Sequence, residues 1–125
     1  MKFGINRLIE DLQNQGYDGA SVINDSAGQT YALISEYRIP AGTFEGCVIE
    51  LAIPAPPQYP QQYGASIQVR SNPPLVGIGH IPNVRNVQDS PLKNGWQYWS
   101  YRFTLPPSNP TNELITQING IFKKN

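Results

Sequence analysis

Proline and glycine restrict one long stretch of this chain more than any other feature of the sequence. Residues 71–94 contain four of the chain's twelve prolines, together with two glycines that a single residue separates. Proline fixes its own backbone and has no amide hydrogen to donate, so this composition excludes an ordinary helix or a central strand. The sequence predicts a long irregular loop here, and loops of this length in compact domains are usually functional or disordered.

Alternating apolar residues predict strands before this loop. The runs with this pattern are Ser21 to Asp25, Thr30 to Ile39, Cys47 to Ile53 and Ser66 to Arg70. Turn-forming residues separate the first two runs, and a proline-rich crossing from Pro54 to Pro60 separates the last two. In the second run, alternation predicts one shared face for Tyr31, Leu33, Tyr37 and Ile39. Four consecutive strands with short connections predict an antiparallel meander.

Apolar residues at helical spacing predict a helix near each end of the chain. The first stripe consists of Ile5, Leu8, Ile9 and Leu12. Gly16 can end that helix in a left-handed conformation. The second helix would begin with Asn109 as its N-cap and Pro110 as its first residue. Its stripe consists of Leu114, Ile115, Ile118, Ile121 and Phe122. We expect a single α+β domain of residues 1–125 with an N-terminal helix, a four-stranded antiparallel meander, a long loop and a C-terminal helix.

The charge and hydropathy of the chain argue against several classes of partner. Nine basic and nine acidic residues give a net charge of zero. No face gathers Lys and Arg, so nucleic acid is not an expected partner. No run approaches the roughly 18 consecutive apolar residues of a membrane span, and the first residues lack the apolar core of a secretion signal. We therefore expect a cytoplasmic protein that binds neither nucleic acid nor a membrane.

The single cysteine and single histidine limit the chemistry that the chain can perform. With scattered carboxylates, they make no metal-ligand spacing, so neither a metal nor another cofactor is expected. Cys47 has the same strand parity as the apolar residues of its run, which predicts a buried side chain and a poor nucleophile. A reactive group is better sought in the segment from Gly95 to Phe103, where Ser100 lies among two tryptophans and two tyrosines.

The order of these elements and several short motifs resemble a known family. A helix, four strands, the IPAPPQYP crossing, a long loop and a final helix resemble the fold of ubiquitin-conjugating enzymes, whose third strand is also followed by a proline and YP segment. The segments GYDG, YRIPAGTFEG and GWQYWSYRF look like those of the bacterial ubiquitin-conjugating-like proteins called prokaryotic family E. Members of that group are encoded beside ubiquitin-like proteins, activating-enzyme homologues and JAB-type peptidases, and they lack the usual nucleophilic cysteine.

The resemblance implies a set of catalytic residues. In conventional ubiquitin-conjugating enzymes, the catalytic cysteine precedes a WSPA-like segment by a nearly fixed distance. An ungapped comparison puts Ser100 at the cysteine and Pro110 at the proline of that segment. Ser100 is thus the candidate nucleophile, and it would carry a modifier as an oxyester. His80 and Asn83, with Ile81 inserted between His and Pro, resemble the family's His-Pro-Asn motif and imply a general base and an oxyanion-stabilising amide.

Simpler explanations stay open for two parts of this assignment. His80 could instead hold the loop by bonding to a backbone carbonyl. Asp89 and Ser90 lie at the conventional spacing after Asn83, so either could replace Ser100 as the reactive group. An Asp-Ser-Pro sequence is also a common turn, which gives these two residues a purely structural role.

The aromatic segment implies a surface for partners. The candidate partner-binding residues are Trp96, Tyr98, Trp99, Tyr101 and Arg102, because aromatic side chains supply much of the energy of interface cores. Trp96 and Tyr98 could equally pack on the last helix. The resemblance implies a component of a bacterial ubiquitin-like conjugation or processing pathway that binds the modifier and its activating enzyme. A JAB-type peptidase is another candidate partner. The alternatives are a non-catalytic scaffold of the same fold and an unrelated binding module.

Overall fold

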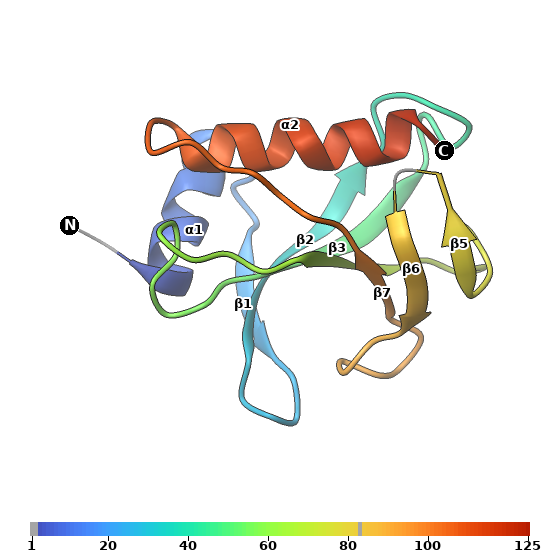
Figure 1. The fold of residues 1–125 in the computed structure, drawn as a ribbon, viewed down its shortest axis with the longest axis horizontal. Helices are drawn as coiled ribbons and strands as arrows, with labels where there is room; N and C mark the ends of the chain where they lie inside the picture. The colour runs from blue at the N-terminus through green and yellow to red at the C-terminus, as the bar shows by residue number, and fades with distance from the viewer. Residues whose placement is uncertain (1–2, 83) are drawn as a thin grey trace.

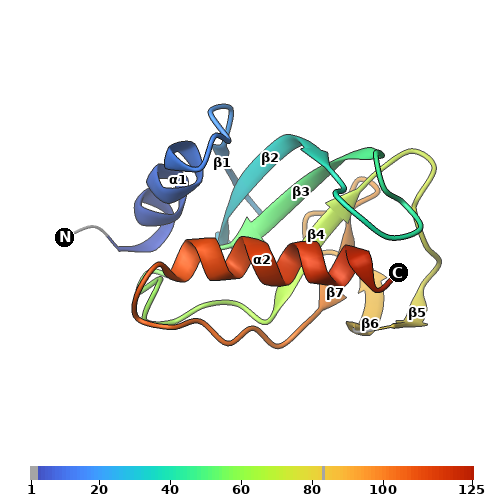
Figure 2. The ribbon, with the colours of Figure 1, turned by 90° about the horizontal axis from the view of Figure 1, so that it is seen from above.

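The computed structural model describes residues 3–82 and 84–125, with the backbone alone for His80. Within these residues the chain forms a seven-stranded antiparallel sheet and two helices. In chain order the elements are α1 (Gly4–Asn14), β1 (Ser21–Asn24), β2 (Thr30–Arg38), β3 (Val48–Pro54), β4 (Ser66–Arg70), β5 (Gly79–Ile81), β6 (Val84–Asp89), β7 (Gln97–Ser100) and α2 (Pro110–Lys123). The strands lie in the order β1-β2-β3-β4-β7-β6-β5. α2 runs across one face of the sheet, and α1 lies beside β1 and β2 near the start of α2 (Figures 1 and 2).

Both predicted helices are present, and their apolar stripes face the core. Leu8 and Leu12 of α1 are completely buried, and Gly16 follows the helix with a positive φ of 100°. The buried residues of α2 are Pro110, Thr111, Leu114, Ile115, Ile118, Ile121 and Phe122. Asn109 and Pro110 occupy the predicted cap and first positions. The Asn109 side chain makes no capping hydrogen bond, because its backbone is left-handed (φ 52°) rather than extended.

Trp99 of β7 anchors α2 on the sheet. Its side chain is completely buried, and its ring centroid lies 5.4 Å from that of Phe122 on α2. Tyr37 of β2 contacts the same ring, with 5.6 Å between the centroids. Burying a large apolar side chain stabilises a fold by about 1.5–3 kcal/mol. These rings therefore fix which face of β7 points toward the helix.

The sheet is larger than the four-stranded meander that the sequence predicts. β1 to β4 are neighbours in chain order, but β7 pairs with β4 and is followed by β6 and β5. The predicted loop of residues 71–94 therefore contains two strands. Its prolines lie outside the strands: Pro73 and Pro74 are in the loop before β5, Pro82 is in the turn between β5 and β6, and Pro91 follows β6. β6 buries Val84 and Val87, which are three residues apart, so it lacks the two-residue periodicity of a typical strand.

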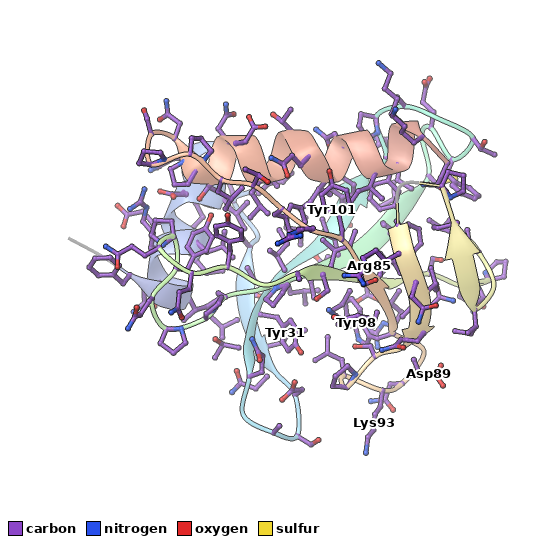
Figure 3. All side chains as sticks on the ribbon, in the orientation of Figure 1. Tyr31, Arg85, Asp89, Lys93, Tyr98 and Tyr101 are labelled. Carbon is purple, nitrogen blue, oxygen red and sulfur yellow. The ribbon has the colours of Figure 1, made fainter. Side chains whose placement is uncertain are left out.

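A bulge in β2 changes which residues share a face of the sheet. The pairing of β2 with β3 shifts by one residue between Ile34 and Tyr37. As a result, Tyr31 and Leu33 pack on the face away from α2, whereas Tyr37 and Ile39 belong to the main core. Figure 3 shows Tyr31 on the far side of the sheet from α2. The prediction that all four residues share one face is wrong, because strict alternation ends at the bulge.

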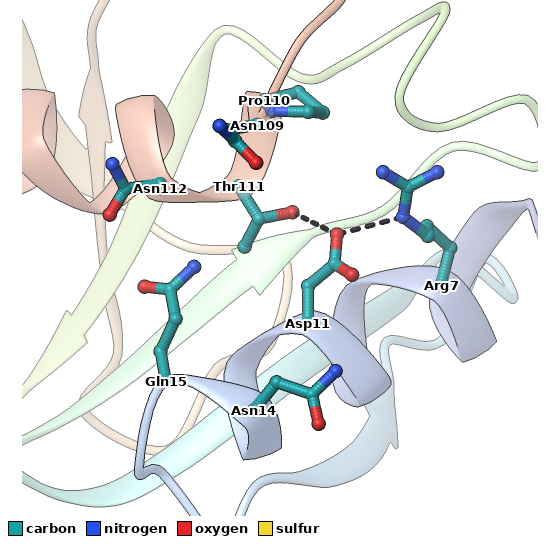
Figure 4. Close-up of a pocket in the computed structure, with 8 residues that line it drawn as sticks. All are labelled: Arg7, Asp11, Asn14, Gln15, Asn109, Pro110, Thr111 and Asn112. Carbon is teal, nitrogen blue, oxygen red and sulfur yellow. Dashed lines mark hydrogen bonds and ion pairs between the residues drawn. The ribbon is translucent and has the colours of Figure 1, made fainter.

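A buried hydroxyl joins the start of α2 to α1 and to the proline-rich crossing. Thr111 Oγ1 donates to Asp11 Oδ2 at 2.6 Å, and Arg7 Nε donates to the same oxygen at 2.8 Å (Figure 4). The Tyr59 hydroxyl lies 2.6 Å from Thr111 Oγ1. Because the single threonine hydrogen goes to the carboxylate, the tyrosine hydroxyl is the donor to the threonine oxygen. Tyr59 is 0% exposed and Thr111 2%, so this end of the chain of hydrogen bonds is shielded from water, whereas Asp11 and Arg7 are partly exposed.

Candidate functional site

Ser100 ends β7 on the face of the sheet away from α2. It pairs with Ser66 of β4 and Asn86 of β6, and the preceding residue, Trp99, points into the core. Successive strand residues point to opposite faces, so Tyr98 and Ser100 point away from that core. Ser100 is half-buried, and its hydroxyl makes no hydrogen bond to any described residue. Its oxygen is therefore free to contact a ligand.

A groove of about 460 Å³ opens beside Ser100, where β6 and β7 stop pairing. We call it the Ser100 groove; its lining residues are Ala65, Arg85, Asn86, Tyr98, Ser100, Tyr101 and Arg102. The Tyr101 amide continues the pairing on the other side by donating to the Ala65 carbonyl at 2.9 Å. In Figure 3, Tyr98 extends away from α2, whereas Tyr101 lies between the sheet and α2. The lining includes no carboxylate, so its two guanidinium groups make the groove cationic.

Of the predicted His-Pro-Asn-like motif, the structure places the backbone of His80, and not beside Ser100. His80 belongs to β5, and β6 lies between β5 and β7. Two strand spacings of about 4.8 Å put its backbone roughly 10 Å from that of Ser100. A general base must come within about 3 Å of the proton's oxygen, so the pairing of His80 with Ser100 stays a prediction. Asn83 lies outside the described residues.

The predicted partner-binding residues divide between the core and the surface. Trp99 is 0% exposed, so its indole has no surface to offer a partner. Trp96 is also buried, but on the opposite face, where it packs with Tyr31 and Ala52. The suggestion that Trp96 packs on the last helix is therefore wrong, and Trp99 fills that role. Tyr98 and Tyr101 are half-buried and Arg102 is exposed; these three residues line the Ser100 groove.

The small cluster around Trp96 is held by charged and polar contacts. The Arg70 guanidinium lies 4.8 Å from the centroid of the Trp96 ring and binds both Glu50 oxygens, at 2.6 and 2.8 Å. These hydrogen bonds lower the pKa of the Glu50 carboxyl. Burial and the Asp25 carboxylate, which accepts the Tyr31 hydroxyl at 2.8 Å, raise the pKa of Tyr31. Each of these groups already has a partner, which indicates a structural role.

Ser90, the alternative reactive residue, is bound within a turn. Its hydroxyl donates to Gln68 Oε1 at 2.6 Å and accepts the Leu92 amide at 3.1 Å. Ser90 is 5% exposed, and Asp89 beside it is exposed. The hydroxyl thus closes the turn after β6 and has no free hydrogen to give. This geometry supports the turn explanation of the Asp-Ser-Pro sequence.

The prediction that Cys47 is buried is wrong. Cys47 is exposed and lies one residue before β3, where its carbonyl accepts the Ile39 amide at 2.9 Å. The alternation of faces holds only inside a strand. The sequence prediction began the strand at Cys47, one residue before β3, and therefore wrongly put the thiol on the core face. The pairing of Glu50 with Arg70 and of Ala52 with Gln68 puts Cys47 and Ser66 toward opposite ends of the sheet. At about 3.3 Å per residue, roughly 20 Å separates Cys47 from the Ser66 and Ser100 end.

Two polar residues of the groove, Arg85 and Asn86, were not among the candidates from the sequence. Both lie in β6, within the segment predicted to be a loop. Their proximity to Ser100 depends on the pairing of β6 with β7, in which Asn86 is opposite Ser100. The only sequence signal for β6 is the pair Val84 and Val87, which is too short to establish a strand or its register.

Among the side chains that the structure describes, which do not include that of His80, no group of three or more His, Cys, Asp or Glu residues could hold a metal ion. Across residues 3–82 and 84–125, no helix has the length and apolar character that crossing a bilayer requires.

The chain is similar to a known protein family. The family model described as "Prokaryotic E2 family E" matches residues 9–123, which is most of the chain. A search of curated proteins and a search of solved structures each found no similar protein. The match extends from α1 to the last residue of α2, and so includes every residue that lines the Ser100 groove.

Proposed function

Since the chain belongs to prokaryotic E2 family E, we propose that it is a ubiquitin-conjugating-like component of a bacterial ubiquitin-like conjugation or processing pathway. In this role it binds a ubiquitin-like modifier and an activating-enzyme homologue in the cytoplasm, and a JAB-type peptidase would act on the same modifier. The order of an amino-terminal helix, consecutive antiparallel strands and a closing helix supports a ubiquitin-conjugating-enzyme-like fold for residues 1–125. The site of action in this proposal is the Ser100 groove.

The free hydroxyl of Ser100 in a cationic groove is the observation that carries the proposal. In the proposed reaction, Ser100 Oγ attacks the terminal carbonyl of the modifier, which arrives as a thioester on the activating enzyme. A carbon–oxygen bond forms, the carbon–sulfur bond breaks, and the serine proton ends on the departing thiolate. The modifier is then held as an oxyester. Arg85 and Arg102 line the same groove, where guanidinium groups would stabilise the negative charge that develops on the carbonyl oxygen.

A serine hydroxyl is a weak nucleophile unless a base removes its proton. We keep His80 as the candidate base and Asn83 as a candidate oxyanion donor. The described side chains that line the groove include no carboxylate or imidazole. That observation favours a second function, a scaffold that binds the modifier without a covalent step and presents it to another enzyme.

Trapping the adduct separates these two functions. The protein is mixed with its activating-enzyme homologue, the modifier and ATP, and the products are separated after denaturation. We expect an adduct that survives thiol reductant and is cleaved by hydroxylamine, that disappears in Ser100→Ala, and that becomes reductant-sensitive in Ser100→Cys. Cys47→Ser is the matched control and should retain the adduct, since Cys47 lies toward the opposite end of the sheet. An unchanged adduct in Ser100→Ala would rule out the oxyester, and modifier binding without any adduct would establish the scaffold.

A further inference from the structure

Two arginines in the described structure have no partner, and both are in the Ser100 groove. The chain contains five arginines. Arg7 pairs with Asp11, Arg70 pairs with Glu50, and Arg38 donates to the Gly46 carbonyl at 3.3 Å. The remaining two are Arg85 of β6 and Arg102, two residues after β7. Within residues 3–82 and 84–125, neither makes a side-chain hydrogen bond or an ion pair.

The surroundings of these two arginines suit one kind of anion. The groove is lined by no acidic residue that could neutralise them. Asn86 and Ser100 add polar groups that can donate hydrogen bonds, and the rings of Tyr98 and Tyr101 form less polar walls. A guanidinium is planar and presents its donors as a fork that fits the two oxygens of a carboxylate. The volume of about 460 Å³ lies in the range of about 300–1,000 Å³ that is typical of ligand sites.

We propose that the Ser100 groove binds the free carboxylate at the end of an extended polypeptide, with Arg85 and Arg102 as its cationic ligands. The chain is neutral overall, and two arginines with aromatic neighbours are too few for a polyanion such as nucleic acid. A single carboxylate suits the positive charge of the two arginines, and the uncharged chain that precedes it can pack against the rings of Tyr98 and Tyr101. This inference rests on the proposed function in identifying that polypeptide with the modifier. It needs neither the covalent step nor the activating enzyme.

A pair of peptides that differ only in their last group tests the inference. Both are N-acetylated and have the same uncharged sequence of glycine and leucine, but one ends in a free acid and the other in an amide. Each is titrated into the ¹⁵N-labelled protein, up to about 1 mM. We expect the acid peptide to move the amide signals of Asn86, Ser100 and Tyr101 and to bind about tenfold more tightly than the amide peptide, because charge-assisted hydrogen bonds to arginine are lost in the amide.

Variants then assign the effect to the two arginines. Arg85→Gln and Arg102→Gln should each bring the affinity for the acid peptide close to that for the amide peptide. Arg85→Lys keeps the charge without the fork, and an intermediate affinity is expected. Arg38→Gln is the matched control, since it removes the same charge from an exposed position outside the groove. It should leave the preference for the acid unchanged.

Several results would overturn the inference. Equal affinity for the two peptides, the absence of any shift at about 1 mM acid peptide, or an equal loss of acid binding in Arg38→Gln would each do so. The same titration on Ser100→Ala separates this inference from the proposed function. A preserved acid preference together with no oxyester would mean that the groove binds a chain end without forming a bond to it. An oxyester together with no acid preference would leave the reaction standing and remove the carboxylate site.

Discussion

Replacing Thr111 with valine should destabilise the protein by about 2–3 kcal/mol. Valine has nearly the same shape as threonine, so the change removes the hydroxyl while it preserves the packing at the start of α2. The Tyr59 hydroxyl then loses its acceptor in a place where the side chain is 0% exposed. Leaving a buried polar group without a partner costs about 1–3 kcal/mol. Asp11 loses one hydrogen bond but keeps its bond to Arg7 and some contact with water, which makes its share smaller.

The measurement is urea unfolding followed by tryptophan fluorescence. Small proteins have slopes of about 1–3 kcal/mol per molar urea, so the expected loss moves the midpoint by roughly 0.7–3 M. Thr116→Val is the matched control. Thr116 is also in α2, but it is exposed, and its hydroxyl bonds only to the Asn112 carbonyl. The same change in helix propensity there should shift the midpoint far less.

A double-mutant cycle tests the mechanism as well as the size of the effect. Tyr59→Phe removes the hydroxyl that Thr111→Val leaves unpaired. The double variant should therefore be more stable than the sum of the single effects predicts, by about 1–2 kcal/mol. Strict additivity, or a Thr111→Val variant as stable as Thr116→Val, would refute the reasoning that the buried chain of hydroxyls holds the two helices together.

The buried Tyr59 hydroxyl, the close approach at Gly42 and the exposed Cys47 thiol can each be tested. Burial raises the pKa of the Tyr59 hydroxyl to about 12 from its usual 10.0. The unfolded chain loses this proton at lower pH than the folded protein, so the stability that is present below pH 10 should fall as the pH approaches 12. In urea unfolding, Tyr59→Phe should show a weaker fall over the same pH range. Gly42 has a φ of 93°, and a Cβ there would overlap the Phe122 carbonyl oxygen. Gly42→Ala should therefore lower the melting temperature more than Gly28→Ala does. Gly28 also has a positive φ, but a Cβ at that position would enter open space. Equal melting temperatures would exclude the overlap. Cys47 is exposed, so its thiol should react with a thiol reagent in the native protein at a rate close to that in denaturant. Cys47→Ser should leave the urea midpoint of unfolding nearly unchanged. Slow labelling of the native protein would contradict the exposure of the thiol.

The helices could be predicted from the sequence because each signal is local. A stripe at helical spacing, with Gly16 after one helix and Pro110 at the start of the other, depends only on neighbours along the chain. The faces of β2 could not be predicted in the same way. The bulge after Ile34 has no residue that marks it, and it arises from how β2 pairs with β3. Strict alternation along β2 therefore assigned half of the strand's side chains to the wrong face of the sheet.

The candidate site was predictable only in part for the same reason. Ser100 stood out because its aromatic neighbours mark the segment around it. Arg85 and Asn86 did not, since only the pairing of β6 with β7 brings them beside it. A groove between strands is made by residues that are distant in the chain, and a single sequence carries no direct record of which strands become neighbours.

The bulge also means that β2 cannot slide along its neighbour. Before the bulge, Ala32 and Ile34 fill the main core, and after it Tyr37 and Ile39 do so. Moving the strand by one position would bring Glu36 or Arg38 to the place of Tyr37 and would turn the Tyr37 ring away from the main core. Because core residues alternate differently before and after the bulge, β2 can pair with its neighbour in only one register. β2 should therefore pair poorly with other strands, including the same strand of another molecule.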